Sequence, residues 1–198
     1  MYNEVIKFSF IVSMIFCFCC CYEEKQVIKE DFLRNIEIHI PMDSLIKLSP
    51  KCRLPDYMSN EECPNLRYII YYDSLMCSSC QLHRMGIWRS IIKHANSINK
   101  NKVNFLFVFN PKREDVLDFV EEFYSKKIML DIYVDSCGVL ESLNPIIQKN
   151  RTFHALLLNE NYRIEAIGNP ELNVRIEKKF YDFIEDYEKP QIHKFEER

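Results

Sequence analysis

Glycine is scarce in this chain of 198 residues, which contains three of them. Phosphate-binding loops need several closely spaced glycines, because glycine alone lets the backbone approach a phosphate closely. The sequence contains neither a Gly-x-Gly-x-x-Gly pattern nor a Walker loop. We therefore predict no nucleotide-binding loop of either kind.

Basic stretches are also lacking. The chain has 26 lysines and arginines against 29 acidic residues, for a formal net charge of −3. Proteins that bind nucleic acid usually carry a concentrated positive patch, so no nucleic-acid partner is predicted. Hydrophobic residues make up 47% of the chain, which is enough to form the core of one domain.

The sequence has no apolar run as long as the roughly 20 residues of a membrane-spanning helix. Residues 8–21 are almost entirely apolar and follow a short polar start that contains Lys7. Their length fits the hydrophobic region of a secretory signal, about 7–15 residues. An uncleaved N-terminal anchor is the alternative. In either case we expect the rest of the chain to leave the cytoplasm.

The apolar run ends in cysteines instead of an Ala-x-Ala cleavage site. Cys19, Cys20 and Cys21 are followed at once by polar residues, including Glu23 and Glu24. This pattern resembles a bacterial lipoprotein signal, and the acidic pair resembles the surface-export signal of Bacteroidetes lipoproteins. The resemblance implies a palmitate-type lipid anchor at Cys21, with Cys20 as the second candidate. It places the protein at the membrane of the bacterial cell envelope, on the periplasmic side or at the cell surface.

A Cys-x-x-Cys sequence lies between a predicted strand at residues 68–72 and a predicted helix. The helix is indicated by apolar residues at every third or fourth position: Leu82, Met85, Trp88, Ile92 and Ala95. Unpaired N–H groups at a helix N-terminus favour a thiolate at Cys77, and Cys80 is close enough to form a disulfide with it. The pattern favours a redox-active pair, with a static disulfide or a metal site as alternatives.

Histidines support the metal-site alternative. Cys77, Cys80 and His83 have Cys-x-x-Cys-x-x-His spacing, and His154 is a further candidate ligand. Two thiolates with one or two imidazoles could bind zinc or copper. The competing interpretation places His83 on the exposed side of the helix. Covalent haem attachment is excluded, because Gln81 stands where that motif requires histidine.

Outside the signal and the Cys-x-x-Cys pair, three further cysteines are present. Cys52 and Cys63 flank a short loop in a connector that is punctuated by prolines. A bridge between them would stabilise the fold by about 3 kcal/mol in the chain-entropy model, although sequence cannot fix the pairing. Cys137 is expected to be a small buried residue, with a resolving or sensing thiol as the alternative.

Hydrophobic periodicity and turn residues predict several further elements. Strands are predicted at residues 35–40, 103–109, 128–134, 153–158 and 162–167, the last two forming a hairpin. Helices are predicted after Asn110-Pro111, at residues 136–143 and at the C-terminal end, with these apolar positions: Val116, Phe119, Val120, Phe123, Leu172, Val174, Ile176, Phe180, Phe183 and Ile184.

This order of elements, together with the Cys-x-x-Cys site, resembles the thioredoxin-like thiol–disulfide oxidoreductases of bacterial envelopes. Residues 156–164 are similar to the hairpin of that family, and residues 168–170 to its Gly-x-Pro. The resemblance implies an α/β, three-layer fold whose central mixed sheet is flanked by helices, with residues 128–145 as an extra strand-helix insertion. The thioredoxin-like resemblance covers residues 66–188. Together with the lipoprotein signal it divides the chain into four parts: a signal at 1–21, a strand and connector at 22–65, the thioredoxin-like domain at 66–188 and a charged tail at 189–198.

The resemblance also implies roles for residues. Cys77 would attack and Cys80 would resolve, with protein thiols or disulfides of the envelope as partners and no cofactor besides the cysteine pair. Tyr72, Met76, Phe153 and His154 would bind the partner. A partner-binding lipoprotein with a structural disulfide is a further, non-catalytic interpretation.

The chain departs from the family in three places. The position of the family's cis-proline falls on Phe153 or His154. The position of its buried acid falls on Tyr71, and Asp73 lies two residues further along the same strand face. Asp73 could substitute as a proton acceptor, but we expect it to be exposed at the strand end. Finally, the two serines between the cysteines add no charge.

Overall fold

The computed structural model describes residues 33–51, 66–99 and 103–187. Two compact units divide the chain between Glu37 and Ile38. The sheet and helices discussed below all belong to the second unit.

Six strands form one mixed sheet in the order β1-β4-β3-β2-β5-β6. Their bounds are β1 Ile46–Leu48, β2 Leu66–Tyr72, β3 Val103–Phe109, β4 Ile132–Val134, β5 Ala155–Leu158 and β6 Ile164–Ile167. β2 pairs in parallel with β3 and antiparallel with β5, so the strand that leads to the cysteine pair lies inside the sheet. β4 is parallel to β3, whereas β1 closes the edge in the antiparallel direction.

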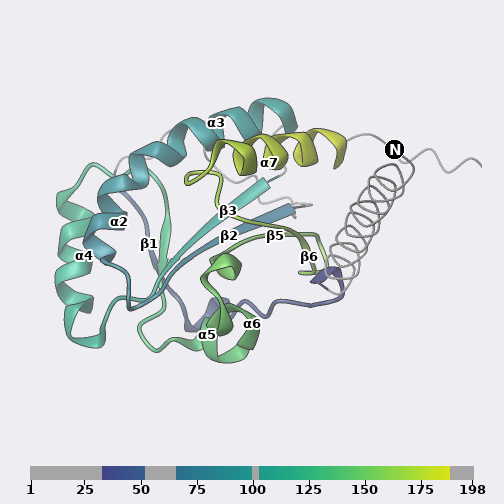
Figure 1. Ribbon diagram of the computed structural model, residues 1–198. Helices are drawn as coiled ribbons and strands as arrows, with labels where there is room; N and C mark the ends of the chain where they lie inside the picture. The colour runs from purple at the N-terminus through teal and green to yellow at the C-terminus, as the bar shows by residue number, and fades with distance from the viewer. Residues whose placement is uncertain (1–32, 52–65, 100–102, 188–198) are drawn as a thin grey trace, which may run out of the picture. The chain divides into compact units, whose positions relative to one another are not determined.

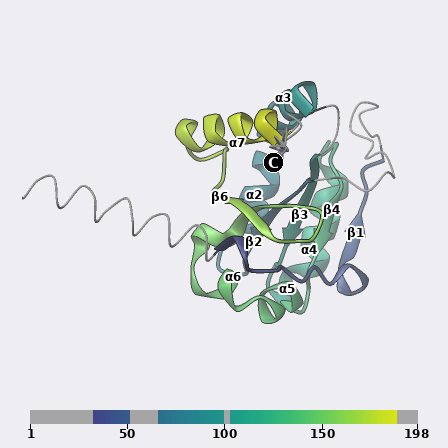
Figure 2. The same cartoon turned by 90° about the vertical axis from the view of Figure 1, so that its right-hand side faces the viewer.

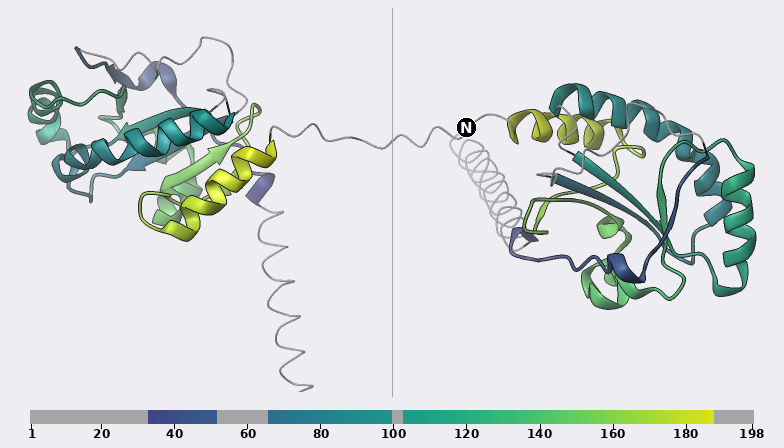
Figure 3. Two further views of the ribbon diagram at one scale, coloured as in Figure 1. Left: turned by 90° about the horizontal axis from the view of Figure 1, so that it is seen from above. Right: turned by 180° about the vertical axis from the view of Figure 1, so that it is seen from behind.

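Helices cover both faces of the sheet. They are α2 Ser78–Arg84, α3 Trp88–Asn99, α4 Val116–Ser125, α5 Val139–Leu143, α6 Pro145–Lys149 and α7 Val174–Tyr187. Figure 1 shows α3 and α7 over one face and α5 and α6 over the other, and Figure 2 shows these layers from the side. Seen from above in Figure 3, α3 and α7 run side by side. The predicted three-layer α/β fold is confirmed, including an extra strand and helix between α4 and the hairpin. These are β4 and α5, and α6 follows as a second short helix that was not predicted.

The core on the α3 and α7 face is rich in aromatic rings. Trp88 is fully buried, and its ring lies 5.1 Å from the Phe107 ring and 6.1 Å from the Tyr68 ring, between centroids. Its Nε1 donates a hydrogen bond to the hydroxyl of Tyr72 at 3.3 Å. These contacts tie the first turn of α3 to β2 and β3, because alternate strand residues face the same layer.

Residues 35–40 do not form the predicted strand. Ile38 is buried and its N–H donates to the carbonyl of Tyr162, while both backbone groups of His39 bond the side chain of Asn144. These backbone groups bond to a turn residue and to a side-chain amide, so they are not available to pair with a neighbouring strand. The antiparallel edge strand forms later, at Ile46–Leu48.

Other boundaries also differ from the predictions. The strand predicted at residues 128–134 is limited to Ile132–Val134. The helix predicted from Leu172 begins at Val174, and the side chains of both residues are exposed. Among the residues that the structure describes, no helix is long and apolar enough to span a membrane.

Candidate functional site

The cysteine pair lies where β2 passes into α2. After Tyr72 the chain turns, with the N–H of Met76 donating to the carbonyl of Asp73 at 3.1 Å. Cys77 is the N-cap of α2, and its sulfur accepts from the N–H of Cys80 at 3.3 Å. The two cysteines form a disulfide with a Cα–Cα distance of 5.2 Å. Both are exposed, so burial does not separate an attacking from a resolving cysteine.

The helix that follows is interrupted. α2 has seven residues and gives way to a 3-10 turn, η3 Met85–Ile87, before α3 begins at Trp88. The apolar periodicity predicted one continuous helix. Leu82, Met85 and Trp88 are nevertheless all buried, so the predicted apolar face was correct and the continuity was wrong.

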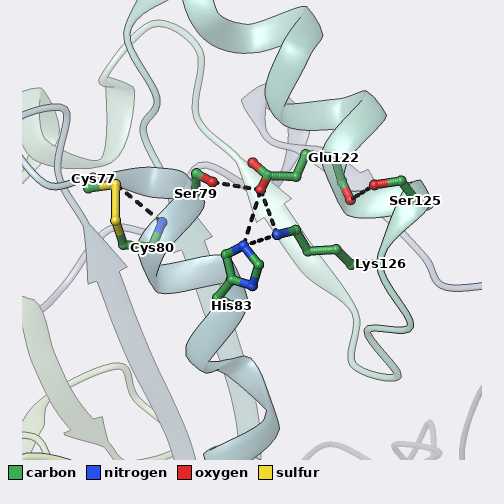
Figure 4. A network of polar contacts seen from close by, with 7 residues as sticks. All are labelled: Cys77, Ser79, Cys80, His83, Glu122, Ser125 and Lys126. Carbon is green, nitrogen blue, oxygen red and sulfur yellow. Dashed lines mark hydrogen bonds and ion pairs between the residues drawn. A yellow bond between two sulfur atoms is a disulfide. The ribbon is translucent and has the colours of Figure 1, made fainter.

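A network of four polar residues links α2 to α4, and we call it the Glu122 network (Figure 4). The Ser79 hydroxyl donates to Glu122 Oε1 at 2.6 Å, and Lys126 Nζ lies 2.7 Å from the same oxygen. His83 Nε2 lies 3.8 Å from Glu122 Oε1 and contacts the Lys126 ammonium. Burial alone would raise the pKa of Glu122, but hydrogen bonds from Lys126 and Ser79 outweigh it and hold that pKa below its ordinary value.

Sequence reasoning missed Glu122 and Lys126. Their i, i+4 spacing on a predicted helix would have indicated an ion pair. It would not have placed that pair beside Ser79, because 43 residues separate Ser79 from Glu122 in the chain.

The metal alternative gains no support from the site. The His83 side chain is 66% exposed, as the competing interpretation predicted, and it turns toward Glu122 and Lys126. Among the described residues, no group of three or more histidine, cysteine or acidic side chains is arranged to hold a metal ion.

The four proposed partner-binding residues do not form one exposed surface. Met76 and Phe153 are half-buried, which is compatible with contact to a partner. Tyr72 is 3% exposed and belongs to the core, because its ring packs on Phe109 and its hydroxyl accepts from Trp88. The prediction that Tyr72 contacts a partner is therefore wrong. His154 is also buried.

Asp73 is buried, contrary to the expected exposure at the strand end. Its Oδ2 lies 3.3 Å from Arg151 Nε and 4.0 Å from His154 Nδ1, and its Oδ1 accepts from the N–H of Leu75 at 3.0 Å. Arg151 and His154 belong to a 3-10 turn, η5 Arg151–His154, which covers the end of β2. Phe153 and His154, the two positions where the resemblance would place a cis-proline, both lie in this turn, and every described peptide bond is trans.

The His154 side chain lies between Tyr71, which is in β2, and Asp73, which directly follows β2. Its ring contacts the Tyr71 ring edge to face, with centroids 5.2 Å apart, and its Nδ1 faces Asp73. Burial lowers the pKa of His154, and the negative charge of Asp73 opposes this effect only in part. The structure therefore favours the neutral imidazole at this position.

Tyr71 also anchors a second polar group, on the face of the sheet that α5 and α6 cover. Its hydroxyl donates to Glu141 Oε2 at 3.1 Å and accepts from Asn110 Nδ2 at 3.0 Å. Burial raises the pKa of Tyr71, so the hydroxyl keeps its proton. The sequence gave no sign of this group, because its members come from β2, from the end of β3 and from α5.

Cys137 is an exposed free thiol in the loop after β4, so the prediction that it is buried is wrong. Gly138, with a φ of 66°, follows it in a turn that places the loop at the surface. The predicted lipidation site Cys21 and the predicted Cys52–Cys63 bridge lie outside the described residues.

No protein-family model matches the chain, and no curated protein matches it either. Solved structures that are similar to it include the following three. The exposed lipoprotein thioredoxin Etrx1 from Streptococcus pneumoniae strain TIGR4 shows 12% identity over 61% of this chain and 86% of that chain, with a TM-score of 0.38.

StoA from Bacillus subtilis shows 17% identity over 60% of this chain and 85% of its own, with a TM-score of 0.38. A thioredoxin-like protein solved in solution in the oxidized form shows 14% identity over 69% of this chain and 98% of its own, with a TM-score of 0.39. Function is not inherited with a broad fold, so the proposal below rests on the site.

Proposed function

We propose that the protein is a thiol–disulfide oxidoreductase of the bacterial cell envelope that exchanges disulfides with partner proteins. The observation that carries the proposal is the exposed Cys77–Cys80 disulfide at the junction of β2 and α2. An exposed pair is accessible to another protein, whereas a disulfide that only staples the fold needs no access.

The reaction consists of two exchanges. In the reduced protein the Cys77 thiolate attacks a partner disulfide, a mixed disulfide forms, and one partner sulfur leaves as a thiolate. The Cys80 thiolate then attacks the Cys77 sulfur, the Cys77–Cys80 disulfide forms, and the partner leaves with two thiols. The reverse sequence oxidises the partner, and the reduction potentials of the two couples decide the direction.

Cys77 is proposed as the attacking residue because it caps α2. Its sulfur already accepts the N–H of Cys80, and a thiolate would accept that hydrogen bond more strongly. Met76 and Phe153, both half-buried, are proposed to contact the partner next to the pair. His154, which is buried, is proposed to support this surface and not to touch the partner.

The test is a Cys80→Ser variant expressed in cells. Because Cys77 can still attack and nothing resolves the product, mixed disulfides with envelope proteins should accumulate as reductant-sensitive bands on non-reducing gels. Cys137→Ser is the matched control, since it removes an exposed thiol outside the pair and should trap nothing. Gels of Cys80→Ser without a trapped partner would contradict the proposal.

The location and domain layout extend the proposal. Residues 1–21 would be a lipoprotein signal with Cys21 lipidated, residues 22–65 a connector with a Cys52–Cys63 bridge, and residues 66–188 the catalytic domain before a charged tail. A Cys21→Ser variant should move from the membrane fraction to the soluble fraction and lose incorporation of labelled palmitate. Retention of both properties would contradict lipidation at Cys21 and favour Cys20.

A further inference from the structure

A carboxylate from α4 lies beside the first turn of α2. Glu122 Oε1 accepts the hydroxyl hydrogen of Ser79 at 2.6 Å, and Ser79 is one of the two residues between the cysteines. Figure 4 shows Ser79 between the disulfide and Glu122. An uncharged serine thereby connects the cysteine turn to a charged group of another helix.

The charge of Glu122 is partly shielded from water and partly balanced. The Glu122 side chain is 24% exposed, and Lys126, at 22%, lies 2.7 Å away. The lowered pKa of Glu122 keeps the carboxylate ionised near neutral pH. Charges in such surroundings are screened less than those in open water.

We propose that Glu122 is a positioning residue that sets the reduction potential of the Cys77–Cys80 pair, held in place through Ser79 and balanced by Lys126. The inference rests on the proposed function. Reduction leaves a thiolate on the same helical turn as Ser79. A nearby negative charge disfavours that thiolate, and a nearby positive charge favours it. The balance between Glu122 and Lys126 therefore sets how readily the disulfide is reduced.

The first variant is Glu122→Gln in the full-length protein. The amide oxygen can still accept from Ser79, so the contact remains while the negative charge is lost. We expect the equilibrium constant for reduction by glutathione to rise about threefold to tenfold, a tenfold change being about 30 mV for a two-electron couple. The Cys77 pKa, followed by thiolate absorbance, should fall.

Two further variants test the direction of the shift in the equilibrium constant and the role of the hydrogen bond between Ser79 and Glu122. Lys126→Met leaves the carboxylate unbalanced and should lower the equilibrium constant. Ser79→Ala keeps every charge but releases the carboxylate, and should raise the constant by less than Glu122→Gln does. Glu121→Gln is the matched control, because the exposed neighbour on α4 loses the same charge away from Ser79 and should leave the constant unchanged.

The outcomes are distinguishable. Opposite shifts for Glu122→Gln and Lys126→Met, with Glu121→Gln unchanged, would support the inference. Shifts of the same sign, equal shifts for Glu121→Gln and Glu122→Gln, or no shift at all would overturn it while leaving the oxidoreductase intact. A wild-type protein without any reversible dithiol couple would overturn the proposed function, and this inference with it.

Discussion

Asp73 and His154 show how far single residues can be understood from the sequence. Strand alternation placed Asp73 on the face of Tyr71, and His154 indeed contacts both. The expected exposure of Asp73 was wrong because η5 covers the strand end, and no local pattern predicts which distant turn packs there. The prediction for Cys137 was wrong in the opposite direction: it was expected to be buried in the core, but it lies in a turn at the surface.

The buried imidazole of His154 predicts a dependence of stability on pH. Burial lowers its pKa in the folded state, so below about pH 6.5 the unfolded chain binds more protons than the folded chain does. The contribution of the neutral His154 imidazole to the free energy of unfolding is therefore fully present above about pH 6.5. It is lost as the pH falls through the folded-state pKa. Urea unfolding at about pH 7.5 and about pH 5 should show this loss in the wild type and a smaller loss in His154→Gln.

The control for this experiment is His83→Gln. The His83 side chain is 66% exposed, so the variant should keep the wild-type dependence on pH. An equal loss of stability in the wild type and in His154→Gln would show that His154 does not produce the effect.

At the scale of secondary-structure elements, the sequence pattern did not predict the break between α2 and α3. Apolar spacing runs without interruption through Leu82, Met85 and Trp88, because the same face stays buried through the 3-10 turn η3. Periodicity reports which face is buried, and it does not report whether the hydrogen-bond ladder is continuous. Gly86 lies in this turn, and a Cβ built on it meets nothing within 4 Å.

Gly86→Ala should therefore stabilise the protein. Alanine favours helical backbone over glycine by about 0.5–1 kcal/mol, and the site has room for the methyl group. Gly168→Ala should do the reverse, because Gly168 has a φ of 122° and its Cβ would lie 3.0 Å from Ile176 Cγ2. Denaturant unfolding of both variants checks these two predictions. A destabilised Gly86→Ala variant would mean that the η3 turn requires glycine at this position.

At the scale of the whole molecule, the order of elements together with the Cys-x-x-Cys site was enough to predict the fold class by resemblance. A buried strand, an amphipathic helix and a second buried strand predict parallel pairing, which β2 and β3 show, and the hairpin of β5 and β6 follows as expected. What could not be predicted are contacts between distant segments. The bond of Tyr71 to Glu141 spans 70 residues, and that of Ser79 to Glu122 spans 43.

These distant contacts surround the end of the sheet where the cysteine pair lies. η5 covers Asp73 at the end of β2, and α4 supplies the Glu122 network beside Ser79. The sequence therefore predicted the cysteine pair that we propose to react, whereas the residues expected to adjust its chemistry became visible only in the fold. The central claim concerns the pair itself, since each adjustment matters only if the disulfide is exchanged.

The most direct test of that claim is the reduction potential of the Cys77–Cys80 pair, measured in metal-free buffer with bound metal assayed on the same sample. We expect a reversible two-electron dithiol couple between about −270 and −120 mV and no stoichiometric metal, and the value will give the direction of electron flow. A disulfide that resists ordinary thiol reductants, or stoichiometric bound metal, would contradict the account.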